Sequence, residues 1–145
     1  MTINNNNAVK QARRFAEALQ KKDYKAAEKL LAPGCVYFQI ARELKGPQAI
    51  VGSFKESMEW GVDQFDSIER ESSVKPTEDG QALLTFFFKI RHKGKSLRIR
   101  SEQIFELDEA ERIGRIEHVE LASQANDLFK FYFETGIIRK SGDSL

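Results

Sequence analysis

Residues 41–50 read Ala41-Arg42-Glu43-Leu44-Lys45-Gly46-Pro47-Gln48-Ala49-Ile50. They follow a short apolar segment, residues 35–40, which is predicted to be a strand, and they lead into an amphipathic segment, which is predicted to be a helix. Gly46-Pro47 marks the start of this helix, because a proline in the first turn loses no intrahelical hydrogen bond. The helix would bury the side formed by Ile50, Phe54 and Met58. Together with its flanks, this stretch indicates a small cone-shaped domain with a hollow interior.

Two more helices are predicted before residue 41. From Ala8 onward, apolar residues recur at spacings of three and four, with arginines and lysines on the other face. Asp23 can cap a second helix, which Pro33-Gly34 would end. Residues 1–7 are rich in asparagine and are expected to form a disordered tail.

The spacing of apolar residues then changes to two, which is typical of strands. Turns separate four predicted strands, at residues 66–76, 82–92, 95–107 and 112–122. The middle turn is Lys93-Gly94, a two-residue hairpin turn that needs a positive φ at glycine. Ser123 can cap a last helix over residues 124–135, which Gly136 would end.

The order of the predicted elements places helices first and strands afterwards, which argues for an α+β fold. We expect a cone-shaped, curved antiparallel sheet with three N-terminal helices packed on its concave face, and a C-terminal helix. The chain of 145 residues suits one domain. This domain would span residues 8–136, and residues 137–145 are expected to form a flexible tail.

Composition narrows the class of function. The 23 basic and 22 acidic residues are intermixed, so the net charge of +1 gives no general attraction to nucleic acid or to an acidic membrane surface. The single cysteine, Cys35, permits neither an intrachain disulfide nor a cysteine metal site. The N-terminus lacks the features of a signal peptide, and no apolar run is long enough to span a membrane. We therefore expect a cytoplasmic protein with no nucleic-acid partner, no membrane partner and no metal.

The hairpin at Lys93-Gly94 sets which residues face one another. It pairs Phe86 with Ser101 and places Gln103 on the same face as Ser101. The opposite face of this strand carries four charged residues, Arg98, Arg100, Glu102 and Glu106. Since burying those charges would be costly, the face with Ser101 and Gln103 is predicted to point inward.

The register of the last strand depends on the following turn. If that turn spans residues 108–111, Ser101 opposes His118 and Ile99 opposes Glu120. Polar groups on this inner face would then lie among phenylalanines, as in a cavity with apolar walls and a few convergent polar groups. A slip of one residue would instead turn His118 and Glu120 outward.

His118 is the candidate for acid/base catalysis, because an imidazole titrates near neutral pH. The alternative is a histidine that only bonds to Ser101 or that faces solvent. Tyr37, Trp60 and Phe86 are candidates for lining a ligand pocket, and ordinary core packing is the alternative for these aromatic residues. The two histidines of the chain are predicted to lie too far apart to share a metal ion.

Several segments match the pattern of a known superfamily, namely residues 15–24, 30–33, 44–50, 104–107 and 112–113. Through them the chain resembles the nuclear transport factor 2-like superfamily, which includes the steroid delta-isomerases and the SnoaL-like polyketide cyclases. The resemblance covers about residues 8–122. It implies an α+β cone, and it carries little information about activity because this fold hosts many functions.

The resemblance implies that isomerase chemistry is absent. The family's catalytic tyrosine falls on Phe15, its aspartate base falls near Tyr37 and Phe38, and the protonated aspartate of its oxyanion hole falls on Gln103. Since all three groups are replaced, steroid-type isomerisation is not expected. Cyclase-like members place an acid or a base on the last strand, where His118 and Glu120 are the nearest candidates.

Two functions remain open from the sequence. The first is a small-molecule pocket protein of SnoaL-like type, which binds a hydrophobic, partly polar compound or transforms it by proton transfer in an isomerisation, cyclisation or hydrolysis. His118 would move the proton, and no organic cofactor is expected because the chain has no glycine-rich phosphate loop. The residues expected to contact the ligand are Phe15, Tyr37, Trp60, Phe86, Ser101, Gln103 and Glu120.

The second function is a non-catalytic, dimeric association module whose cone is filled with side chains. The eleven phenylalanines of the chain would suit such a filling. The last helix is aromatic on more than one side over residues 128–133, so it would either cap the cone or pack against a second subunit. A homodimer is expected, also because members of the similar superfamily commonly pair through the sheet.

Overall fold

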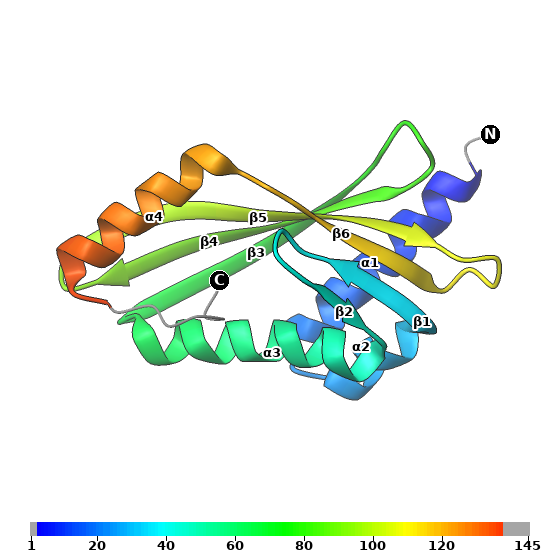
Figure 1. Ribbon diagram of the computed structural model, residues 1–145, viewed down its shortest axis with the longest axis horizontal. Coiled ribbons are helices and arrows are strands. Elements are labelled where there is room, and N and C mark those ends of the chain that lie inside the picture. Colours follow the sequence, from blue (N-terminus) through cyan, green and yellow to red (C-terminus); the bar gives the residue numbers. More distant parts are fainter. Residues whose placement is uncertain (1–2, 138–145) are drawn as a thin grey trace.

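The computed structural model of the protein describes residues 3–137. Figure 1 shows long strands that arch over one helix, α3, with α4 beside one end of them. The helices are α1 (Ile3–Gln20), α2 (Tyr24–Leu30), α3 (Pro47–Gln64) and α4 (Ala122–Thr135). The strands are β1 (Leu31–Phe38), β2 (Glu43–Lys45), β3 (Ser67–Pro76), β4 (Ala82–His92), β5 (Lys95–Leu107) and β6 (Ile113–Val119).

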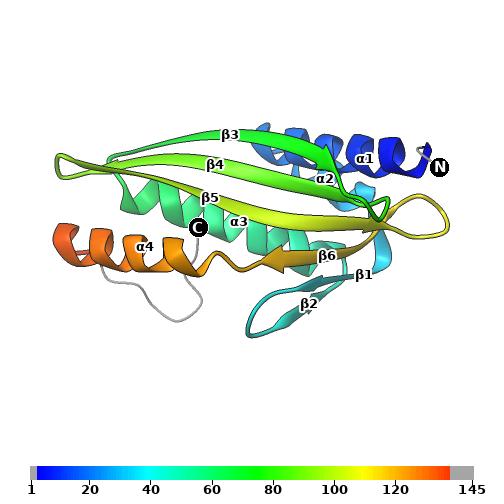
Figure 2. The same cartoon turned by 90° about the horizontal axis from the view of Figure 1, so that it is seen from above.

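The strands form one six-stranded sheet in the order β2-β1-β6-β5-β4-β3. Strand β1 runs parallel to β6, and every other neighbouring pair is antiparallel. The sheet is therefore mixed, and the prediction of an antiparallel sheet is wrong for this one pair. Side chains alternate between faces in both kinds of pairing, so the sequence pattern does not reveal the direction of a strand's neighbour. The α+β class and the curved sheet are confirmed. Figure 2 shows α1 on the side of the long strands where β3 lies and α4 on the side where β5 and β6 lie.

Two boundaries differ from the predictions because of contacts distant in sequence. Helix α1 begins at Ile3, before the predicted start at Ala8, so residues 3–7 continue the helix. The Asn7 side chain donates to Oε1 of Glu111 at 2.9 Å, which ties this first part of α1 to the turn between β5 and β6. Of the predicted tail at residues 137–145, the structure describes Ile137, whose nitrogen donates to the carbonyl of Tyr132 at 3.0 Å, and residues 138–145 lie outside the described residues.

Strand β1 begins directly after α2 and includes Pro33 and Gly34, which were predicted only to end the helix. Both residues are exposed and lie where the pairing of β1 with β6 shifts register. Proline is tolerated at such an irregularity because no ladder hydrogen bond from its nitrogen is required there. The predicted cap of α2 is confirmed, since the Asp23 side chain accepts a hydrogen bond from the nitrogen of Ala26 at 3.2 Å.

The register of β4 against β5 is confirmed, with Phe86 opposite Ser101. The predicted pairing of Ser101 with His118 is wrong, because His118 lies opposite Gln103. Two irregularities cause this difference. The nitrogen of Asp108 donates to the carbonyl of Arg112 at 2.8 Å, which shortens the turn by one residue, and the ladder shifts again beside Gly114. Because the two shifts add to an even number, His118 stays on the inner face.

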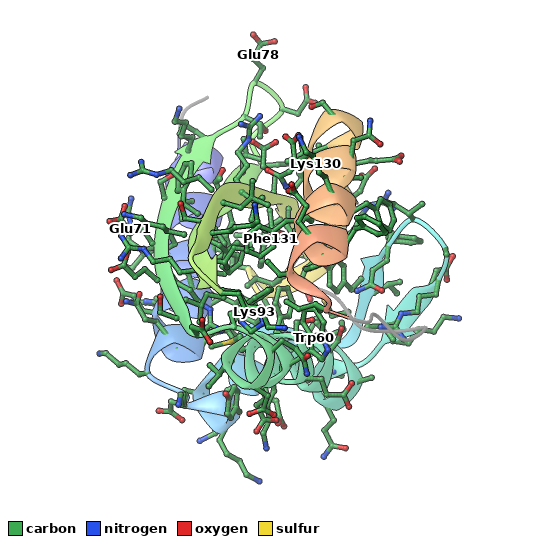
Figure 3. The ribbon with its side chains drawn as sticks, turned by 90° about the vertical axis from the view of Figure 1, so that its left-hand side faces the viewer. Trp60, Glu71, Glu78, Lys93, Lys130 and Phe131 are labelled. Carbon is green, nitrogen blue, oxygen red and sulfur yellow. The ribbon has the colours of Figure 1, made fainter. Side chains whose placement is uncertain are left out.

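The buried residues form two clusters. The first lies where α1, α2 and α3 meet the sheet, and its largest fully buried side chains are Phe15 and Phe105. The second lies at the other end of the long strands, where Phe131 and Tyr132 of α4 pack near Trp60. Figure 3 shows Phe131 pointing from α4 toward the strands. Helix α4 therefore packs over one end of the inner face through one side, as one of the two predicted arrangements required.

Helix α4 also covers a free edge of the sheet. Strand β6 ends at Val119, which pairs with Glu102, so the start of β5 has no further strand beside it. Gln124 of α4 accepts a hydrogen bond from the nitrogen of Arg100 at 2.7 Å and donates one to its carbonyl. The amide thus substitutes for a neighbouring strand at this point. Within residues 3–137, no helix is long and apolar enough to cross a membrane.

Candidate functional site

A cavity of about 730 Å³ lies between the inner face of the sheet and α3. Its lining comes from α1, α3, β1 and the loop after it, and strands β3 to β6. Aromatic rings make much of the wall: Phe54 stacks on Tyr37 with ring centroids 5.3 Å apart, and Phe86 stacks on Phe88 at 6.4 Å. The apolar lining is completed by Leu19, Ile40, Ala41, Met58 and Ile68. The other lining residues are polar or charged, so the wall is mixed in character.

Three polar side chains meet in this cavity from β5 and β6. The amide nitrogen of Gln103 donates to the hydroxyl of Ser101 at 2.5 Å, and His118 lies opposite Gln103 on the neighbouring strand. Gln103 is only 2% exposed. Its Oε1 is buried and accepts no hydrogen bond from any residue in the described part of the chain. Since buried polar atoms are almost always paired, this unpaired oxygen is an exception, which a donor on a bound molecule would remove.

Burial sets the protonation state of the two titratable groups nearest to Gln103. Burial lowers the pKa of His118 below its usual 6.5, and the carboxylate of Glu120 opposes this to a smaller extent. Burial raises the pKa of Tyr37 to about 12, against hydrogen bonding with Gln39 and Gln103 and the positive charge of Arg42. At neutral pH the imidazole is therefore uncharged and able to accept a proton, and the phenol keeps its proton and can donate a hydrogen bond.

The opposite wall of the cavity carries an arginine. Arg70 lies on β3 opposite Phe88 of β4, and it is half-buried. Its Nη2 donates to the carbonyl of Met58 in α3 at 3.0 Å. Its Nε is buried without a hydrogen-bond partner among residues 3–137, and burial lowers the pKa of the guanidinium.

Sequence reasoning missed Arg70, although a signal was present. The segment Ile68-Glu69-Arg70-Glu71-Ser72 alternates, and a hairpin turn at residues 78–80 would place Arg70 opposite Phe88. Phe88 shares a face of its strand with Phe86, which pairs with the inward-facing Ser101, so Arg70 must share that face.

Comparison with known proteins supports the fold. No protein-family model matches the sequence, and no curated protein matches it significantly. Among solved structures, Bal32a from a soil-derived mobile gene cassette is 20% identical, with a TM-score of 0.67, over 87% of this chain and 98% of that chain. A candidate polyketide cyclase from Xanthomonas campestris pv. campestris is 12% identical, with a TM-score of 0.63, over 84% of this chain and 96% of its own.

A third solved structure is a Mycobacterium tuberculosis protein in complex with estradiol-17beta-hemisuccinate. It is 12% identical, with a TM-score of 0.56, over 81% of this chain and 95% of that chain. This chain has an NTF2-like fold. The predicted resemblance to the nuclear transport factor 2-like superfamily is thereby confirmed at the level of the fold.

In this NTF2-like cone, five of the residues predicted for the site line the cavity: Tyr37, Phe86, Ser101, Gln103 and His118. They come together because the inner faces of β1, β4, β5 and β6 all turn toward α3.

The other three predicted site residues do not line the cavity. Phe15 is fully buried in the core behind Phe54, with ring centroids 5.4 Å apart. Trp60 packs against Tyr132 in the second cluster, at 6.0 Å. Glu120 is exposed and follows the end of β6. Glu120 was placed by a strand period that continues only as far as β6, which ends at Val119. Over the residues that the structure describes, no group of three potential metal ligands occurs.

We expect the His118 imidazole to titrate below pH 6.5, because burial disfavours its charged form. The unfolded chain then binds more protons than the folded chain just below pH 6.5, so acidification through this range lowers the free energy of unfolding. Imidazole ¹H–¹⁵N spectra recorded against pH would give the midpoint, with His118→Gln to assign the signal. Glu120→Gln should lower the midpoint further, and a wild-type midpoint at or above 6.5 would contradict the burial of this side chain.

Proposed function

We propose that this chain is a small-molecule pocket protein that binds, or transforms by proton transfer, a hydrophobic and partly polar compound. The observation that carries the proposal is the cavity of about 730 Å³, with aromatic walls and the cluster Ser101, Gln103 and His118 on one side. Ligand sites in proteins commonly enclose about 300–1,000 Å³ and combine apolar walls with a few polar groups. The estradiol-17beta-hemisuccinate complex of the Mycobacterium tuberculosis protein is an instance of this fold holding a hydrophobic compound.

The polar cluster supports a chemical role for each of its members. A neutral His118 could take a proton from the compound and return it at another position, as an isomerisation or cyclisation requires, or take one from an attacking water and pass it to the leaving group in a hydrolysis. The amide of Gln103 and the hydroxyl of Ser101 would orient an oxygen of the compound, and the phenol of Tyr37 could donate to it. Steroid-type isomerisation is not proposed, because Phe15 has no hydroxyl group and lies outside the cavity lining.

The alternative function, an association module with a filled cone, is less well supported because the cone contains an open cavity. Association through another surface is compatible with the pocket. Phe129 and Phe133 are 61% and 88% exposed on the outer side of α4, which would suit a second copy of the chain. We therefore retain a cytoplasmic homodimer as part of the proposal, on sequence grounds and this exposed pair.

A crystal structure of protein purified without added ligand would test the proposal. We expect an open cavity, or a co-purified compound next to His118 and Gln103 that mass spectrometry of an organic extract can identify. Ser101→Phe should displace such a compound by filling the cavity, whereas Ser96→Phe, on the exposed start of β5, should leave it in place. A cavity closed by the side chains of Phe54, Phe86 and Phe88 would refute the pocket.

A further inference from the structure

We propose that the ligand of this cavity is an elongated hydrophobic acid whose anionic oxygen binds to Arg70. The inference rests on the proposed function, since it assumes that the cavity takes a small molecule, and it adds the charge and the shape of that molecule. The side chain concerned, Arg70, has no role in the polar cluster at His118.

Arg70 is incompletely satisfied inside the protein. A guanidinium has five N–H donors and stays charged under all ordinary conditions. Only Nη2 of Arg70 has a protein acceptor, the carbonyl of Met58, and Nε is buried without any acceptor in residues 3–137. No ion pair of Arg70 occurs over that same range. Burial already disfavours the charged form, since it lowers the pKa of this group.

An anion would supply the two things that Arg70 lacks inside the protein, namely a hydrogen-bond acceptor for Nε and a counter-charge for the guanidinium. A neutral oxygen would satisfy one N–H but would leave the half-buried charge without a counter-charge. A carboxylate, enolate or phenolate supplies the charge, and its hydrogen bonds to a guanidinium are stronger than neutral ones. Nε and a neighbouring Nη form the side of the guanidinium that can hold two oxygens of one carboxylate.

The other charged groups at the cavity also favour an anion. Arg42, in the loop after β1, lines the cavity and is exposed, with its Nε donating to Gln39 at 2.7 Å. His118 is the other basic group, and it is neutral at pH 7 because burial lowers its pKa. Glu71 is the acidic residue in the lining, and it is exposed. An anion entering past Arg42 would therefore meet attraction at the rim and at Arg70.

The sheet sets the length of the ligand. Arg70 lies on β3 and His118 on β6, which are three strand spacings apart in the sheet, or roughly 14 Å. His118 also pairs with Gln103, four residues along β5 from Ile99, which lies in line with Arg70. One oxygen cannot contact both groups across that separation. The anionic end would therefore lie at β3 and the reacting end at Gln103 and His118. The apolar middle would lie against Phe86 and Phe88, which lie between these two groups on β4.

Two fluorescent probes that differ by one anionic group test the proposal. They are 8-anilinonaphthalene-1-sulfonate and the neutral N-phenyl-1-naphthylamine, titrated into the full chain. We expect Arg70→Met to weaken binding of the sulfonate by about tenfold or more and to change binding of the neutral probe by less than about threefold. Arg70→Lys should recover part of the loss because it restores the charge. The matched control is Arg91→Met, which removes an exposed arginine from the outer face of β4 and should affect neither probe.

The outcomes separate the two proposals. Equal loss of both probes in Arg70→Met, or an unchanged affinity for the sulfonate, would overturn the role of Arg70 while leaving the pocket intact. Failure of the wild-type chain to bind either probe, or binding that Ser101→Phe does not reduce, would overturn the pocket as well. If Arg70→Met does not fold, the anion site is tested on wild-type protein by displacing the neutral probe with decanoate or with decanol. Decanoate should then act at a concentration about tenfold or more below that of decanol, and equal potency would refute the anion site.

Discussion

Phe15→Ala should lower the free energy of unfolding by about 3–5 kcal/mol. The ring of Phe15 is fully buried and packs against Phe105, with centroids 5.5 Å apart, and against Phe54. Its removal loses the burial of the ring and leaves a void between α1 and the sheet that the neighbouring strands are too rigid to fill. Urea denaturation, followed by far-UV circular dichroism and by the fluorescence of Trp60, would give the value.

The matched control is Phe133→Ala, which removes the same ring from a position that is 88% exposed on α4. At a protein concentration low enough to keep the chain monomeric, we expect this change to alter the free energy of unfolding by less than about 0.5 kcal/mol. A loss that grows with protein concentration would show that a second copy covers this face of α4, as proposed above. A small loss in Phe15→Ala itself would contradict the packing of α1 against the sheet.

Gly114→Ala should lower the free energy of unfolding by about 1–3 kcal/mol, because it overpacks the turn between β5 and β6. A Cβ at Gly114 would lie 3.1 Å from the Cβ of Asp108. Asp108 cannot easily move away, since its Oδ1 accepts hydrogen bonds from the nitrogens of Ala110 and Arg112 at 2.9 and 3.0 Å. Thermal and urea denaturation would measure the loss.

Gly52→Ala is the control for Gly114→Ala. Gly52 lies inside α3, and a Cβ there would meet no atom within 4 Å. Alanine is the better helix former, so we expect a gain of up to about 1 kcal/mol. If Gly114→Ala proves as harmless as Gly52→Ala, the shift in register beside Gly114 is not constrained by this contact. Nuclear Overhauser contacts between His118 and Gln103 would show whether their pairing survives the change.

The hairpin of β4 and β5 illustrates what local chemistry can predict. Lys93-Gly94 forms a two-residue turn, with φ of 50° and 79°, and such a turn leaves one register for the strands on either side. The outer face of β5 carries too many charges to be buried, so the register also decides which residues face the cavity. Turn chemistry and charge together are therefore enough to predict that Ser101 and Gln103 face inward.

Three residues, Phe15, Trp60 and Arg70, were misplaced or missed for a different reason, because contacts between distant segments decide where they lie. Trp60 and Phe15 have the apolar character of a pocket wall, but the packing of α3 and α1 against their neighbours turns both rings into the core. Arg70 was overlooked because an arginine in an alternating polar strand is usually exposed. Its burial results from α3 crossing the inner face of β3, where the carbonyl of Met58 accepts one of its hydrogen bonds.

By itself, the sequence determined the α+β class, most element positions, the β4–β5 register and the inner face of the sheet. These features follow from turn chemistry and from hydrophobic period, which act over a few residues. Only the tertiary structure decided the parallel pairing of β1 with β6, the placement of His118 opposite Gln103, and the burial of Arg70. Each of these depends on which segments distant in sequence come into contact. Such contacts arise from the packing of the whole chain around one cavity, because no local pattern encodes the partner of a strand or of a buried charge.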